Sequence, residues 1–156
     1  MTAGFHGADV IEAAKCELAG EVLRAWGTLR LRVTGWSMLP AVWPGDTLVV
    51  ESASIGEVRE GDIVLCGRNR RVCAHRVVKK LDRSTFLTRG DAMRQPDPVV
   101  HSQELLGRVS HIVRDGKRAA VRRRRGIPER AIATIVRHSP TAARVLVGIR
   151  DRLRSS

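Results

Sequence analysis

Hydrophobic residues recur at helical spacing near the start of the chain. Residues 8–26 read "ADVIEAAKCELAGEVLRAW", and their apolar positions fall mostly three or four residues apart. Asp9 is suited to be the N-cap, with Glu12 three residues further on, which is the spacing of a capping box. The pattern predicts an amphipathic helix within residues 1–27 that ends near Gly27 and packs on its own domain.

The middle of the chain changes to the two-residue alternation that is typical of strands. In "TLRLRVTG", residues 28–35, leucine and valine alternate with arginine, as in a half-buried strand. Gly-Asp pairs at 45–46, 61–62 and 90–91 supply turns between such segments. Five further segments have strand character: "DTLVVES", "DIVLCG", "RVCAHRVVKKL", "STFLTRGD" and "ELLGRVSHIVRDG". We therefore predict a mainly β domain with complex strand pairing over residues 28–115.

Positive charge is concentrated at the C-terminal end. From Arg114 onward the chain holds 13 of its 28 Lys and Arg residues but only three of its 16 acidic residues, so this segment carries +10 of the net +12. Pro128 and the pair Ser139-Pro140 predict two short helices there. Residues 116–156 thus form a basic helical tail, which either contacts an anionic membrane surface peripherally or is simply solvated. We do not expect nucleic-acid binding, because no recognisable module accompanies the charge.

Length and composition limit the class of protein. A chain of 156 residues with 43% hydrophobic and 28% charged residues fits one folded domain with a tail. No apolar run approaches the roughly 18 residues of a membrane-spanning helix, and the N-terminus lacks the pattern of a secretory signal. Three cysteines without metal-type spacing indicate reduced thiols, so we expect a cytoplasmic protein with no metal or other cofactor.

One serine stands in apolar surroundings in "TGWSMLP". The Ser37 hydroxyl becomes a strong nucleophile only when a neighbouring base takes its proton. Among the five histidines, His75 lies inside a strand, "VCAHRVV", whose alternation places it on one face with Cys73 and Val77. A histidine on an apolar strand face is more often a core residue than a catalyst, so His75 alone is weak evidence.

Two aspartates follow the next strand, in "TRGDAMRQPDPVV". Either Asp91 or Asp97 can orient a histidine ring and stabilise the imidazolium that forms when the ring accepts a proton. Both are equally suited to be turn residues. Sequence separation does not decide whether Ser37, His75 and an aspartate converge.

The order of several short motifs points to a family. "GWSMLP", "PGD", "EGDIVLC", "AHRVV", "FLTRGDAMRQPD" and "LLGRV" follow one another over roughly residues 29–113. This series resembles the signal peptidase family of serine peptidases, whose complex β-fold is shared with the self-cleaving LexA-like repressors. Typical bacterial signal peptidases have lysine before Arg-Val, whereas "AHRVV" has histidine, as in the archaeal and endoplasmic-reticulum subtype.

The resemblance implies a role for each matching residue. It makes Ser37 the nucleophile, His75 the general base and Asp97 the aspartate of the triad, with Asp91 as a supporting acidic position. It also implies that three residues of the serine segment shape the nucleophile turn, in which the Ser37 amide contributes to an oxyanion hole: Gly35, Met38 and Pro40.

One departure from the family changes the expected location. Signal peptidases are anchored by a hydrophobic helix just before the serine box, but an amphipathic helix and "TLRLRV" stand there. We expect a soluble cytoplasmic serine endopeptidase, or one at the inner face of the membrane, acting on a precursor peptide or protein. The alternatives are self-cleavage at Ala19-Gly20, as in LexA-like proteins, and a catalytically silent binding module that uses the basic tail. The oligomeric state is not predicted.

Overall fold

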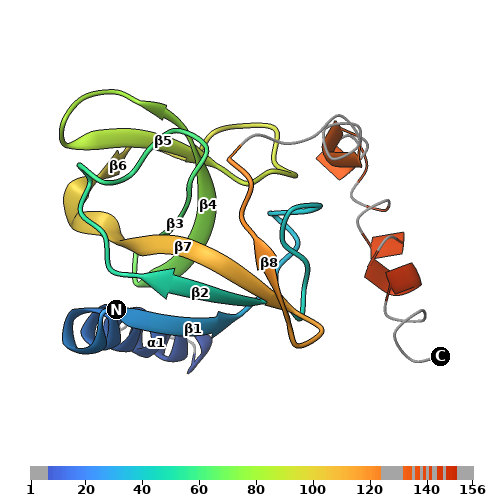
Figure 1. The fold of residues 1–156 in the computed structure, drawn as a ribbon, viewed down its shortest axis with the longest axis horizontal. Coiled ribbons are helices and arrows are strands. Elements are labelled where there is room, and N and C mark those ends of the chain that lie inside the picture. Colours follow the sequence, from blue (N-terminus) through green and yellow to red (C-terminus); the bar gives the residue numbers. More distant parts are fainter. Residues whose placement is uncertain are drawn as a thin grey trace, which may run out of the picture.

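The computed structural model confirms the predicted mainly β class. It describes residues 7–123 and, beyond them, residues 132–134, 136–137, 139, 141, 144–145 and 147–150. Helix α1 comes first and is followed by strands, with a short 3-10 helix, η1, before β7 (Figure 1). Their bounds are α1 Gly7–Trp26, β1 Thr28–Arg32, β2 Thr47–Glu51, β3 Ile63–Arg68, β4 Arg71–Lys80, β5 Thr85–Arg89, β6 Val100–His101, η1 Ser102–Glu104, β7 Leu105–Arg114 and β8 Lys117–Ala120.

The predicted helix and the six predicted strands are present, and two strands were missed. Strand β6 has only two residues, too few for an alternation to appear. Residues 117–120, which we expected in the helical tail, instead form β8 and pair with β7. The reason is the tight turn at Asp115 and Gly116, which both adopt positive φ angles, as a two-residue hairpin requires.

The basic tail is partly helical. Described residues on both sides of Ser139 have helical conformation, whereas Ser139 itself does not. Pro128 and Pro140, where we predicted a helix start and a break, lie outside the described residues. Among the described residues, no helix is both long enough and apolar enough to cross a bilayer.

The strands form one antiparallel sheet in which distant segments become neighbours. The order is β1-β2-β7-β3-β4-β5-β6, and β8 adds to β7 (Figure 1). Strand β7, late in the chain, thus lies between β2 and β3. Strand β4 is bordered by β3 and β5, so the histidine-bearing strand lies inside the sheet rather than at its edge.

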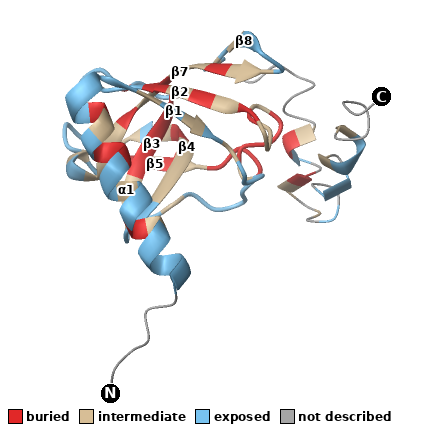
Figure 2. Cartoon of the chain, turned by 90° about the horizontal axis from the view of Figure 1, so that it is seen from below, coloured by how far each residue is buried: buried red, intermediate tan, exposed pale blue. Residues whose placement is uncertain are grey.

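Both faces of β3 are buried, which defines two cores. Ile63 and Leu65 pack in one cluster with Leu23 of α1, while Val64 and Cys66 pack in the other, with residues of β4, β5 and β6. Helix α1 covers the first cluster and keeps its outer face exposed (Figure 2). Strand β4 alternates between these clusters, so the predicted face of His75 is confirmed: it is shared with the buried Val77 of the second cluster.

Each Gly-Asp turn buries an aspartate and pairs it with an arginine distant in the sequence. The pairs are Arg114–Asp46 at 2.7 Å, Arg123–Asp62 at 2.6 Å and Arg76–Asp91 at 2.7 Å. A carboxylate removed from water needs a charged partner to remain ionised. Part of the positive charge of the basic segment therefore neutralises aspartates buried in the β domain.

Replacement of Asp46 by alanine tests this pairing. We expect Asp46→Ala to lower the free energy of unfolding by about 3 kcal/mol, because Arg114 and Arg150 would lose their shared carboxylate at a largely buried position. Urea unfolding measures the change. The matched control is Asp9→Ala. Helix α1 includes Gly7, so Asp9 lies in its first turn and not at the predicted N-cap, and its pair with Arg71 is exposed; its loss should matter far less. Equal destabilisation of both variants would contradict the inference.

Candidate active site

Ser37 lies in the turn between β1 and β2, which apolar side chains hold against the protein. The Leu39 N–H donates to the Trp36 carbonyl at 3.1 Å, and the Val42 N–H donates to the Met38 carbonyl at 3.0 Å. Met38, Leu39 and Val42 are buried, whereas Ser37 remains half-buried. The buried apolar neighbours of the serine thus hold the turn in place, while Ser37 itself remains partly exposed.

Three of the predicted residues form a hydrogen-bonded series. Ser37 Oγ lies 3.0 Å from His75 Nε2, and His75 Nδ1 lies 2.6 Å from Asp97 Oδ2. His75 comes from β4, with a side chain 11% exposed, and Asp97 comes from the loop between β5 and β6. Thr88 holds the aspartate in place: its hydroxyl donates to Asp97 Oδ2 at 2.6 Å and its carbonyl accepts from the Asp97 N–H at 2.8 Å.

The surroundings of His75 favour its charged form. Burial alone would lower the pKa of the ring, but hydrogen bonds to Asp97 and to the Cys73 sulfur, 3.2 Å from Nδ1, outweigh burial and raise the pKa to about 9. In turn, burial alone would raise the pKa of Asp97, but the hydrogen bonds from His75 and Thr88 lower it. The pair is therefore an imidazolium and a carboxylate near neutral pH.

Asp91 forms a buried ion pair with Arg76, separate from the hydrogen bond between Asp97 and His75. Its two carboxylate oxygens accept from Arg76 Nε at 2.9 Å and from Arg76 Nη2 at 2.7 Å, and the residues are 1% and 5% exposed. Arg76 follows His75 on β4, with its side chain on the opposite face. Of the two aspartates that the sequence left open, Asp97 is the one beside the imidazole.

Gly90 is part of the site, although we predicted it only as a turn residue. A Cβ atom at Gly90 would lie 2.6 Å from the Ser37 carbonyl oxygen and 3.1 Å from His75 Nε2. The next residue but one, Ala92, donates its N–H to the same Ser37 oxygen at 2.8 Å. Only glycine allows this approach. At Gly35, by contrast, an added Cβ would meet no atom within 4 Å, so no close packing requires glycine there.

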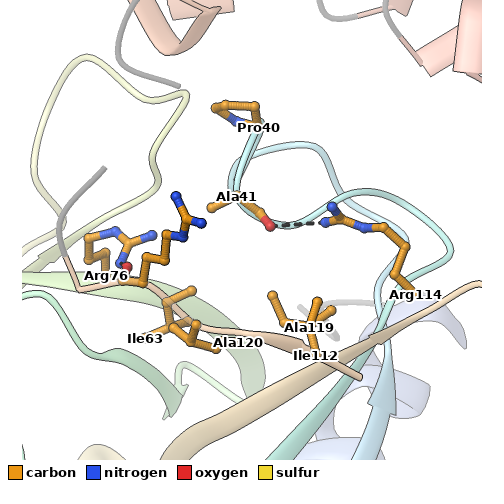
Figure 3. Close-up of a pocket in the computed structure, with 10 residues that line it drawn as sticks. Pro40, Ala41, Ile63, Arg76, Ile112, Arg114, Ala119 and Ala120 are labelled. Atoms are coloured by element: carbon orange, nitrogen blue, oxygen red, sulfur yellow. Dashed lines mark hydrogen bonds between the residues drawn. The ribbon is translucent and has the colours of Figure 1, made fainter. Parts of the chain in front are cut away.

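A cavity of about 320 Å³ lies behind the serine turn. Pro40 and Ala41 of the turn line it, together with residues of β3, β4, β7 and β8 (Figure 3). Arg114 reaches across the cavity and donates to the Ala41 carbonyl at 3.0 Å (Figure 3). The same guanidinium also binds Asp46. This arginine therefore attaches the turn that carries Ser37 to strand β7.

Metal binding and self-cleavage at Ala19-Gly20 have less support among the described residues. Within them, no group of His, Cys, Asp and Glu is arranged to hold a metal ion, and Cys16, Cys66 and Cys73 are free thiols. Ala19 and Gly20, the dipeptide considered for self-cleavage, lie inside helix α1 and are both buried. Cleavage at that bond would require α1 to unwind locally.

Comparison with known proteins adds one family. A family model described as "Peptidase S24-like" matches residues 2–110, a segment that contains Ser37, His75 and Asp97. No curated protein and no solved structure matches the chain significantly.

The electrostatics of His75 are testable by NMR titration. We expect the His75 ring to titrate with a pKa of about 9 and Asp97→Asn to lower that pKa, because burial then opposes the charged form with less compensation. Asp82→Asn, in the exposed turn between β4 and β5, is the control and should leave His75 unchanged. An unaltered His75 pKa in Asp97→Asn would contradict the assignment of Asp97 as its partner.

Proposed function

The chain belongs to the Peptidase S24-like family, and we propose that it is a serine endopeptidase that cleaves a precursor peptide or protein. The observation that carries this proposal is the series Ser37–His75–Asp97, with contacts of 3.0 and 2.6 Å. A hydroxyl, an imidazole and a carboxylate in this order can act as nucleophile, base and orienting group.

In the acylation step, Ser37 Oγ attacks the scissile carbonyl carbon while neutral His75 accepts the hydroxyl proton at Nε2. Asp97 stabilises the imidazolium that forms. The imidazolium then gives this proton to the leaving amine, the C–N bond breaks, and an ester to Ser37 remains. The Ser37 N–H donates no hydrogen bond within the described part of the chain, which supports a role in stabilising the oxyanion, worth about 3 kcal/mol for one donor.

Hydrolysis of the ester completes the cycle. His75 takes a proton from a water molecule whose oxygen attacks the acyl carbon, and the proton passes to Ser37 Oγ as the ester bond breaks. The products are a new carboxylate terminus and the free serine. No metal or other cofactor takes part in this scheme.

The proposed base is a histidine where typical bacterial signal peptidases have lysine. This identity of residue 75 favours the histidine subtype within the wider fold family. With a pKa of about 9, the ring is neutral in about one molecule per hundred at pH 7. Acylation should therefore accelerate as the pH rises toward 9, because the neutral form is the base.

Removal of the nucleophile or the base should abolish turnover. We expect Ser37→Ala and His75→Ala each to lower the rate of cleavage of a synthetic peptide library roughly a thousand-fold or more. Mass spectrometry of the products measures the rate. The matched controls are Ser110→Ala and His111→Ala, which should keep the wild-type rate. Ser110 Oγ lies 3.0 Å from His111 Nδ1, but the mechanism does not use this contact. Equal turnover by wild type and Ser37→Ala would refute the mechanism.

The approach of Gly90 to the serine gives a second test. Gly90→Ala places a methyl group against the Ser37 carbonyl and His75, and a displacement of about 1 Å at reacting groups can lower the rate about a hundred-fold. Gly56→Ala is the control, because an added Cβ there has ample space. The same peptide assay compares them, with circular dichroism to verify folding. Full activity of Gly90→Ala would show that the close approach is not needed for catalysis.

A further inference from the structure

The C-terminal segment packs against both loops of the candidate site, although it lies beyond the residues matched by the family model. Buried Val136 packs in one hydrophobic cluster with Leu39 of the serine turn and Ala92 of the loop after Gly90. Two hydrogen bonds reinforce this contact. Arg137 donates to the Asp91 carbonyl at 3.1 Å, and Arg94 donates to the Arg137 carbonyl at 3.0 Å.

A second attachment lies further along the same segment. Arg150 Nη2 is 3.2 Å from Asp46 Oδ1, at the end of the serine loop. The Arg150 guanidinium also lies 4.8 Å from the centre of the Trp43 ring, within cation–π distance. Described residues of the segment therefore contact the loop that carries Ser37 at two places.

Between the segment and the two loops lies an open groove of about 490 Å³. Its lining is mainly apolar and is completed by three polar or charged residues. The apolar lining residues are Trp36, Ala92, Met93 and Val136, and the others are Arg94, Gln95 and Arg137. Trp36 is 41% exposed and Met93 38% exposed, so both large apolar side chains present surface within one groove rather than at scattered positions. A concave apolar surface of this size is typical of a ligand site. We call it the Trp36 groove.

The Trp36 groove adjoins the proposed nucleophile. Trp36 directly precedes Ser37, and Ala92 donates its N–H to the Ser37 carbonyl at 2.8 Å. A peptide whose scissile carbonyl lies at Ser37 Oγ would therefore bring the side chains of flanking residues beside this groove. The occupant is then the substrate itself, and the lining calls for an apolar side chain.

We propose that the Trp36 groove binds a bulky apolar side chain of the substrate close to the scissile bond, and that Val136 of the C-terminal segment is a specificity-determining wall of it. The inference rests on the proposed peptidase function and adds the substrate class: peptides with leucine, methionine or phenylalanine near the cleaved bond. It gives the C-terminal segment a role in substrate selection.

The test uses the full-length protein and a synthetic decapeptide library in which each position carries Ala, Ser, Asp, Leu, Met or Phe. Mass spectrometry gives kcat/KM for each cleaved sequence. We expect one position near the scissile bond to favour Leu, Met or Phe over Ala by at least ten-fold, since the loss of even one methylene from an apolar pocket is worth about 10–200-fold.

Two variants connect the preference to the groove. Val136→Ala and Met93→Ala should each reduce the preference about ten-fold while cleavage of Ala-containing peptides continues, which separates selection from catalysis. Met93 is exposed, so its replacement does not endanger folding. The control is Leu81→Ala, because Leu81 is 43% exposed but lies at the turn between β4 and β5. It should leave the preference unchanged.

The outcomes distinguish the two proposals. Cleavage by the wild type without an apolar preference, or a preference that both groove variants retain, overturns the role of the groove alone. Labelling of Ser37 by a fluorophosphonate without cleavage of any apolar peptide also overturns the groove alone. If the protein neither cleaves any peptide nor is labelled at Ser37, the proposed function is overturned and the inference with it.

Discussion

The buried ion pair between Arg76 and Asp91 joins the two pieces of chain on which the candidate site depends. Arg76 follows His75 on β4, and Asp91 follows Gly90, which lies against Ser37. The guanidinium also donates to the Gly61 and Arg122 carbonyls, so its charge and its donors are both satisfied at a buried position. Loss of either partner would leave an uncompensated buried charge. The ion pair thus links the strand that carries His75 to the loop that lies against Ser37.

A buried aspartate paired with an arginine also occurs at the other two Gly-Asp turns, and these pairs affect how the net positive charge is interpreted. Gly45 and Gly61 supply the positive φ angles, and each aspartate accepts a hydrogen bond from an N–H of its own turn, at Trp43 for Asp46 and at Arg59 for Asp62. Arginines from the basic segment then neutralise these carboxylates. The charge asymmetry along the sequence therefore overstates the positive charge at the surface, because several arginines of the basic segment pair with buried aspartates of the β domain.

Local sequence patterns were enough to predict most helices and strands and the strand face on which His75 lies. Alternation in β4 correctly placed His75 beside Cys73 and Val77, since strand geometry fixes the face of each side chain. The choice between Asp91 and Asp97 depended on the path of the loop after β5, which no periodicity describes. Strand β8 was missed because the positive charges around it outweighed the Asp115-Gly116 pair, a strong hairpin signal. The close approach at Gly90 exists only after distant segments pack together.

Asp97 has two opposing effects on the proposed base. Its hydrogen bond orients the ring and would stabilise the imidazolium in the proposed acylation, but it also raises the pKa of His75 and so reduces the neutral fraction at pH 7. The rate depends on the product of that fraction and the driving force for proton transfer, and a stronger base increases the second factor. Thr88 and Cys73 act on the same balance, one by holding the carboxylate and the other by contacting Nδ1. The residues that build the proposed triad would therefore also determine the pH range of the proposed reaction.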